Sequence, residues 1–235
     1  MIRRAVAEFL GTALLLVAII GSGIAAQRLS PHDVGLELLE NAIATGAGLV
    51  AIILAVGPVS GAHLNPVITL TDHLFGGVSS RVAGLYVAAQ LLGAVAGTAV
   101  ANSMFAMPAL HLSTKVRSGP GLWLAEAVAT FGLVLVVFGL IRSGQVTAVA
   151  FAVGAYIAGA YWFTASTSFA NPAVTVGRML TDTFTGIAPG SVPAFVLSQL
   201  AGGAVAVPAV RFLYPGVAGV AGRVLIPHEK NRESG

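Results

Sequence analysis

The same short motif occurs twice in this chain, each time inside an apolar stretch. The two copies are Asn65-Pro66-Val67 and Asn171-Pro172-Ala173. Asparagine is a favoured N-cap residue and proline a favoured first helical residue, so each copy predicts the start of a helix. The stretches that follow, 66–75 and 172–180, are shorter than the roughly 20 residues needed to cross a bilayer. We therefore expect two half-helices. Irregular backbone at membrane depth is tolerated only inside protein or beside a watery cavity, so this pattern indicates a pore.

The composition is that of an integral membrane protein. Hydrophobic residues make up 56% of the chain, charged residues 9%, and the mean hydropathy is +0.89, whereas a soluble domain carries roughly 25% charged residues. The chain has no cysteine, which excludes disulfides, thiolate metal sites and cysteine nucleophiles. The formal charge of +3 comes from residues scattered at segment ends, which indicates contact with a lipid bilayer rather than with nucleic acid.

Six apolar segments are each long enough to span a membrane. They cover residues 5–26, 36–57, 82–103, 122–141, 146–165 and 192–213. The first segment resembles a secretory signal, but Glu8 within it argues against that interpretation. We expect one transmembrane channel domain over residues 1–225, followed by a short cytoplasmic tail at 226–235.

An even number of spans places both termini on one side of the membrane. The basic residues on that side would be Arg3, Arg4, Arg81, Arg142, Arg211, Arg223, Lys230 and Arg232, against Arg28, Lys115, Arg117 and Arg178 opposite. Basic residues favour the cytoplasmic side. The sequence therefore predicts a multi-pass protein of the cell (inner) membrane with both termini in the cytoplasm.

The two halves of the chain, about 5–103 and 122–213, are related to each other. Glu8 corresponds to Glu126, and Gln90 to Gln199, in the same order as the two Asn-Pro motifs. Each half contains three spans, an odd number, so the second half must cross the membrane in the opposite direction to the first. The half-helices would then enter from opposite faces, with their N-termini meeting near the midplane.

These paired motifs resemble the major intrinsic proteins, the aquaporin and aquaglyceroporin family. The resemblance implies an all-α fold of six transmembrane helices plus two re-entrant half-helices, assembled as a homotetramer with one pore per subunit. The first motif ends in Val67 where the family usually has alanine. We expect this residue to alter the junction between the half-helices slightly.

The polar groups of the predicted pore have definite roles. Asn65 and Asn171 can each cap a half-helix through the side-chain oxygen and offer the amide NH2 to a passing solute; the alternative is capping alone. Glu8 and Glu126 are expected to accept hydrogen bonds from the loops before the half-helices, with a proton relay as the alternative. His63 is expected to line the pore, with a pH sensor as its alternative.

Selectivity is predicted from the residues at the outer constriction. In most of the family the second motif is followed by arginine, and here that position is Val174. Counting back from the motifs as the family pattern implies, the other filter residues are Thr45, Gly159 and Ser168, with Phe169 as a possible replacement for Ser168. Arg178, one helical turn beyond Val174, returns positive charge to this region or is a plain surface arginine.

Small side chains at all four filter positions predict a wide, uncharged filter. The pattern with valine resembles a bacterial aquaglyceroporin subgroup associated with arsenic resistance, and implies conduction of methylated arsenicals. The expected function is a passive channel for small neutral solutes such as water and glycerol-like polyols, with no cofactor and no metal. The alternatives are a water-selective aquaporin and an inverted-repeat secondary transporter. The sequence carries no phosphate loop, metal-spaced histidine pair or activated nucleophile, so we do not expect an enzyme.

Overall fold

The computed structural model describes residues 1–215, which are helical apart from connecting loops and contain no strand. The helices, in chain order, are α1 (Ile2–Leu29), α2 (Val34–Ser60), α3 (Pro66–Leu74), α4 (Ser80–Met104), α5 (Pro120–Arg142), the 3-10 turn η1 (Val146–Ala148), α6 (Val149–Phe163), α7 (Pro172–Arg178), the 3-10 turn η2 (Pro189–Ser191) and α8 (Val192–Leu213). The end of the predicted domain at residue 225 and the tail at 226–235 lie outside the described residues.

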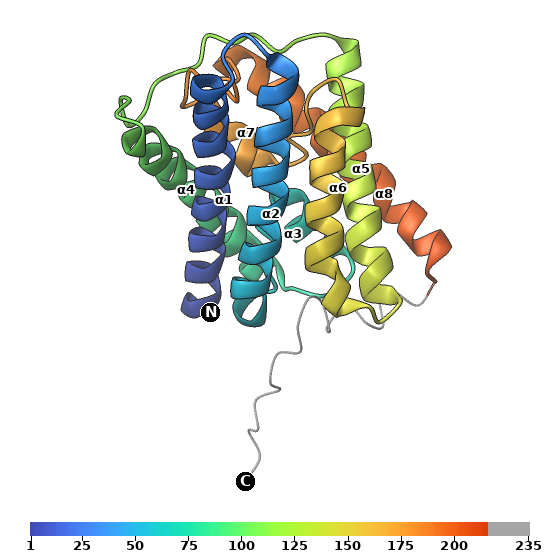
Figure 1. Ribbon diagram of the computed structural model, residues 1–235. Coiled ribbons are helices and arrows are strands. Elements are labelled where there is room, and N and C mark those ends of the chain that lie inside the picture. Colours follow the sequence, from blue (N-terminus) through green and yellow to red (C-terminus); the bar gives the residue numbers. More distant parts are fainter. Residues whose placement is uncertain (216–235) are drawn as a thin grey trace.

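Six of these helices are long and apolar enough to cross a membrane, which confirms the predicted spans. They are α1, α2, α4, α5, α8 with η2 at its start, and α6 with η1 at its start. The two short helices, α3 and α7, begin at Pro66 and Pro172 as the motifs predict. They lie within the bundle, α3 in its lower half and α7 in its upper half, so the two halves of the chain are arranged in opposite directions (Figure 1).

Glycines allow the long helices to approach closely in equivalent places of the two halves. A Cβ atom on Gly93 of α4 would lie 2.3 Å from the carbonyl oxygen of Phe9 in α1. In the second half, a Cβ on Gly202 of α8 would lie 2.2 Å from the carbonyl oxygen of Ala127 in α5. Both distances are shorter than van der Waals contact, so these helices pack this closely only because glycine has no side chain.

Val67 packs against α8. Its side chain faces Gly203 of α8, where an added Cβ would lie 2.4 Å from the Val67 Cγ1 atom. Val67 is 2% exposed, so no space remains for the added carbon. The larger residue in the first motif is thus accommodated by a glycine in α8.

This contact predicts a compensating pair of substitutions. Gly203→Ala should lower the free energy of unfolding by about 1 to 3 kcal/mol through overpacking, and adding Val67→Ala should restore most of the loss. The measurement is thermal unfolding of the purified protein in detergent. Gly84→Ala is the matched helical control, because an added Cβ there meets no atom within 4 Å. Equal destabilisation by Gly203→Ala with and without Val67→Ala would contradict the assigned contact.

Candidate functional site

Asn65 and Asn171 cap the two half-helices. Both have extended backbone conformations, as N-cap residues usually do. Asn65 Oδ1 accepts a hydrogen bond from the backbone N–H of Val67 at 2.9 Å, and Asn171 Oδ1 accepts one from that of Ala173 at 2.9 Å. Proline at the first helical position has no N–H to satisfy, so the side-chain oxygen serves the next free donor.

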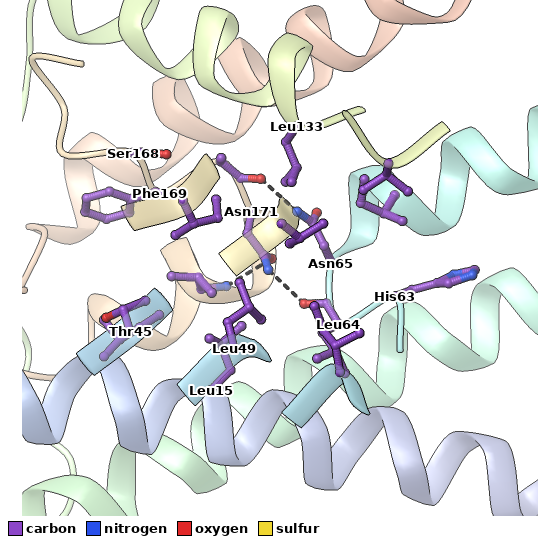
Figure 2. A pocket seen from close by; sticks show the side chains of 18 of the residues that line it. Leu15, Thr45, Leu49, His63, Leu64, Asn65, Leu133, Ser168, Phe169 and Asn171 are labelled. Atoms are coloured by element: carbon purple, nitrogen blue, oxygen red, sulfur yellow. Dashed lines mark hydrogen bonds between the residues drawn. The ribbon is translucent and has the colours of Figure 1, made fainter. Parts of the chain in front are cut away.

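The same two side chains tie the loops together across the centre of the molecule. Asn65 Nδ2 donates to the carbonyl oxygen of Ala170, and Asn171 Nδ2 donates to that of Leu64, both at 2.7 Å (Figure 2). The sequence predicted that the amide groups would donate to a passing solute. In the structure, one N–H of each amide donates to the opposite loop, and the second N–H remains available for a solute.

The loops before the half-helices have an unusual backbone that repeats in both halves. Ala62 and Leu64 have φ angles of 49° and 51°, and the equivalent residues Ser168 and Ala170 have 48° and 49°. Residues other than glycine enter this left-handed region at a cost of about 1 to 3 kcal/mol each. Surrounding interactions must therefore hold these loops in place.

Glu8 supplies that support in the first half. Its Oε1 accepts hydrogen bonds from Ser60 Oγ at 2.6 Å and from the backbone N–H of His63 at 2.9 Å. Its Oε2 accepts from the backbone N–H of Leu64 and from Gln90 Nε2, both at 2.7 Å. The carboxylate is fully buried and serves four donors, which supports the structural role over a proton relay.

Glu126 makes the equivalent contacts in the second half. Its two oxygens accept from the backbone N–H groups of Phe169 and Ala170, each at 2.9 Å. Gln199 Nε2 donates to Glu126 Oε2 at 2.6 Å and to Thr175 Oγ1 at 2.8 Å. In the first half, Gln90 Nε2 likewise donates to Thr69 Oγ1 at 3.0 Å. In both halves, one acid, one glutamine and one threonine therefore connect two long helices to a half-helix.

A cavity runs past the two asparagines. Its walls are mostly apolar, with polar groups at the centre and the two ends. The lining residues are Leu15, Ile19, Thr45, Leu49, Ile53, Ala62, His63, Leu64, Asn65, Ile68, Leu133, Val137, Val149, Val153, Ile157, Tyr161, Ser168, Phe169, Ala170, Asn171, Val174 and Arg178. Thr45, Ser168 and Phe169 lie at one end, which we call the Thr45 end, and His63 lies at the other, the His63 end (Figure 2).

His63 lines the cavity and is held on several sides. Its Nδ1 lies 3.1 Å from Thr69 Oγ1, and its ring meets that of Tyr86 edge to face with centroids 5.3 Å apart. Its Nε2 lies 3.7 Å from the carboxylate of Asp72. This fixed position supports a pore-lining role.

At the Thr45 end, the structure differs from the sequence prediction at one filter position. Thr45, Ser168 and Val174 line the cavity, but Gly159 does not. Gly159 is exposed on the face of α6 opposite the lining residues, because 100° per residue places it half a turn away from them. Tyr161 is the α6 residue that reaches the cavity here, with its hydroxyl 3.3 Å from Thr45 Oγ1.

Phe169 and Arg178 also line this end. The guanidinium carbon of Arg178 lies 3.4 Å from the centroid of the Phe169 ring, a stacked cation-π arrangement. Arg178 Nε donates to the carbonyl oxygen of Thr185, and the residue is only 2% exposed. The interpretation of Arg178 as a plain surface arginine is therefore wrong.

Comparison with known proteins identifies the family. Residues 1–145 match the Major intrinsic protein family. The chain is 52% identical over 211 residues to aquaglyceroporin AqpS of Rhizobium meliloti, covering 90% of each chain. It is 32% identical to a probable TIP-type aquaporin of Medicago truncatula, covering 75% of this chain and 74% of that one. The chain belongs to the major intrinsic protein family.

A solved structure shows the same fold. The crystal structure of the aquaglyceroporin from Plasmodium falciparum matches with a TM-score of 0.72 and 21% identity, over 92% of this chain and 98% of that one. The resemblance to the major intrinsic proteins that the motifs indicated is thus confirmed, as is the all-helical architecture.

Some residues of this family member's site were absent from the sequence prediction. Gln90 and Gln199 were recognised as a repeated pair but given no role, and Tyr161 was overlooked because the filter was placed by counting. A polar side chain inside an apolar span, repeated in the second half, was the available signal for the glutamines. No comparable signal marked Tyr161.

The contacts of the acids predict how substitutions behave. At Glu8, glutamine keeps a carbonyl acceptor, whereas leucine strands buried donors at about 1 to 3 kcal/mol each. Glu8→Gln should therefore retain more thermal stability than Glu8→Leu, and the same order should hold at Glu126. Unfolding temperatures in detergent provide the comparison. Equal stability of the two variants would count against the structural role, and a pH-dependent flux lost in Glu8→Gln would favour a proton relay.

Proposed function

We propose that this protein is a passive channel for small neutral solutes, including water, glycerol-like polyols and methylated arsenicals. The observation that carries the proposal is the pair of asparagine donors, Asn65 and Asn171, beside an otherwise apolar cavity. A solute oxygen accepts hydrogen bonds from their free N–H groups and moves past side chains that offer no competing partner. The solute crosses unchanged, so no reaction, cofactor or metal takes part.

The half-helices make the centre of the cavity unfavourable for cations. Each helix N-terminus carries roughly half a positive charge, and Asn65 and Asn171 bring the N-termini of α3 and α7 to the same cavity. A proton or metal cation therefore meets positive potential from both sides. Neutral solutes experience no such barrier.

The filter supports solutes larger than water. Val174 stands where most of the family, by the resemblance, has arginine, and its side chain lines the cavity. A relative with 52% identity is named an aquaglyceroporin. Methylated arsenicals enter the proposal because the valine pattern resembles the arsenic-resistance subgroup.

One observation favours the alternative, a water-selective aquaporin. Tyr161, Phe169 and Arg178 reach the Thr45 end of the cavity, so this end is bulkier and more charged than the predicted set of small groups. An inverted-repeat transporter is less well supported, since Glu8 and Glu126 are occupied by loop donors and are not open to a coupling ion.

We also propose a homotetramer with one pore per subunit, in the cell inner membrane with both termini in the cytoplasm. Arg3 and Arg4 lie in the first turn of α1, Arg81 in the first turn of α4, and Arg142 and Arg211 in the last turns of α5 and α8. These helix ends lie towards the same end of the bundle as the N-terminus (Figure 1). This distribution agrees with the preference of basic residues for the cytoplasmic side.

The deciding experiment is stopped-flow uptake by proteoliposomes of water, glycerol, urea and a methylated arsenical, without an ion gradient. Uptake of glycerol-sized solutes supports the proposal, while uptake of water alone supports the water-selective alternative. A requirement for an ion gradient would indicate a transporter. An assembled Asn65→Ala/Asn171→Ala variant with unaltered uptake would show that the pore lies elsewhere.

Substitution of Val174 tests the filter directly. Val174→Arg should narrow the cavity and reduce glycerol flux more than water flux, while Val174→Thr, of nearly the same volume, should leave the ratio of the two close to that of the wild type. Both fluxes are measured in the same vesicles. Proton leak should stay low in both variants because the half-helix N-termini remain. An unchanged glycerol-to-water ratio in Val174→Arg would remove position 174 from the constriction.

A further inference from the structure

Arg178 has a spare hydrogen-bond donor beside the cavity. Its Nε is bonded to Thr185, but its Nη1 is buried with no protein partner. Leaving a charged donor unpaired is costly in a folded protein. The residue lines the cavity, so a solute oxygen entering there is an available partner.

The positive charge of Arg178 is not neutralised by a neighbour. Among residues 1–215, no carboxylate lies within ion-pair distance of its guanidinium. The Phe169 ring, 3.4 Å away, supports the guanidinium plane without removing its charge.

A second arginine strengthens this positive region from outside the cavity. Arg117 lies over the same Phe169 ring, with its guanidinium carbon 5.1 Å from the centroid. Burial lowers the pKa of Arg117 to about 10, so it remains charged at neutral pH. Its Nε and Nη2 donate to the carbonyl oxygens of Gly186 and Phe184, and it is not a lining residue.

We propose that Arg178 determines specificity at the Thr45 end, by donating a hydrogen bond to the oxygen of a passing neutral solute and by repelling cations. Ser168 supports this role, since its Oγ is buried beside the same cavity without a partner. The filter is therefore charged, although Val174 is not. This inference deepens the proposed function and rests on it, because it concerns how the same cavity selects its solutes.

The test compares Arg178→Gln with Arg28→Gln in proteoliposomes. Arg28 is the matched control because it also lies over a phenylalanine ring, that of Phe105 at 5.2 Å, but is exposed and away from the cavity. Arg178→Gln should raise proton and methylammonium leak at least about tenfold, since a nearby charge acts strongly where water is sparse. It should also change the glycerol-to-water flux ratio, while Arg28→Gln changes neither.

A double variant tests whether a guanidinium at position 174 can replace the one at position 178. Val174→Arg combined with Arg178→Gln moves the guanidinium back by one helical turn, and it should restore low cation leak. Assembled Arg178→Gln channels with wild-type leak and flux ratio would overturn the proposal. If Arg178→Gln does not fold, Arg178→Lys provides the test, because lysine keeps the positive charge but lacks the planar guanidinium. Cation leak should then stay low while the glycerol-to-water flux ratio changes. An unchanged flux ratio would overturn the proposal. Glycerol flux by the wild type tests the proposed function separately.

Discussion

The structure depends on hydrogen-bond partners for the backbone N–H groups of two irregular loops. These loops lie at the depth of a membrane, where lipid offers no such partners. Each loop contains residues with positive φ other than glycine, and each is held by a buried carboxylate that accepts from two consecutive backbone N–H groups. Without Glu8 and Glu126, those donors would be stranded at a cost of several kcal/mol in hydrocarbon. The cavity exists because these acids fix the loops, and with them the half-helices.

The asparagines then convert two separately held loops into one unit. Each caps its own helix and donates to the carbonyl of the other loop. A shift of either half-helix would break bonds on both sides, so the two N-termini keep a fixed relation. The close approach of the surrounding helices at Gly93 and Gly202 leaves little room for such a shift.

Most of this arrangement could be predicted from the sequence, because it follows from residues with strong local meaning. Asn-Pro starts a helix wherever it occurs, an acid in an apolar span needs donors, and a repeat with an odd number of spans inverts. Counting back from the second motif placed Gly159 in the filter, but residue number alone does not show which face of α6 is turned towards the cavity. The burial of Arg178 could not be predicted from the sequence either, because it depends on contacts with the Phe169 ring and the Thr185 carbonyl that no local sequence pattern indicates.

The two ends of the cavity differ although they are built from equivalent positions. The offset that relates Asn65 to Asn171 (171 − 65 = 106) also relates His63 to Phe169 and Asp72 to Arg178. At one end His63 meets Tyr86 edge to face and lies near the acid, and at the other Phe169 meets Phe195 edge to face and carries the guanidinium. The inverted repeat thus places an acidic and a basic residue at equivalent positions. The guanidinium of Arg178 therefore adds positive charge to that of the half-helix N-termini at the Thr45 end.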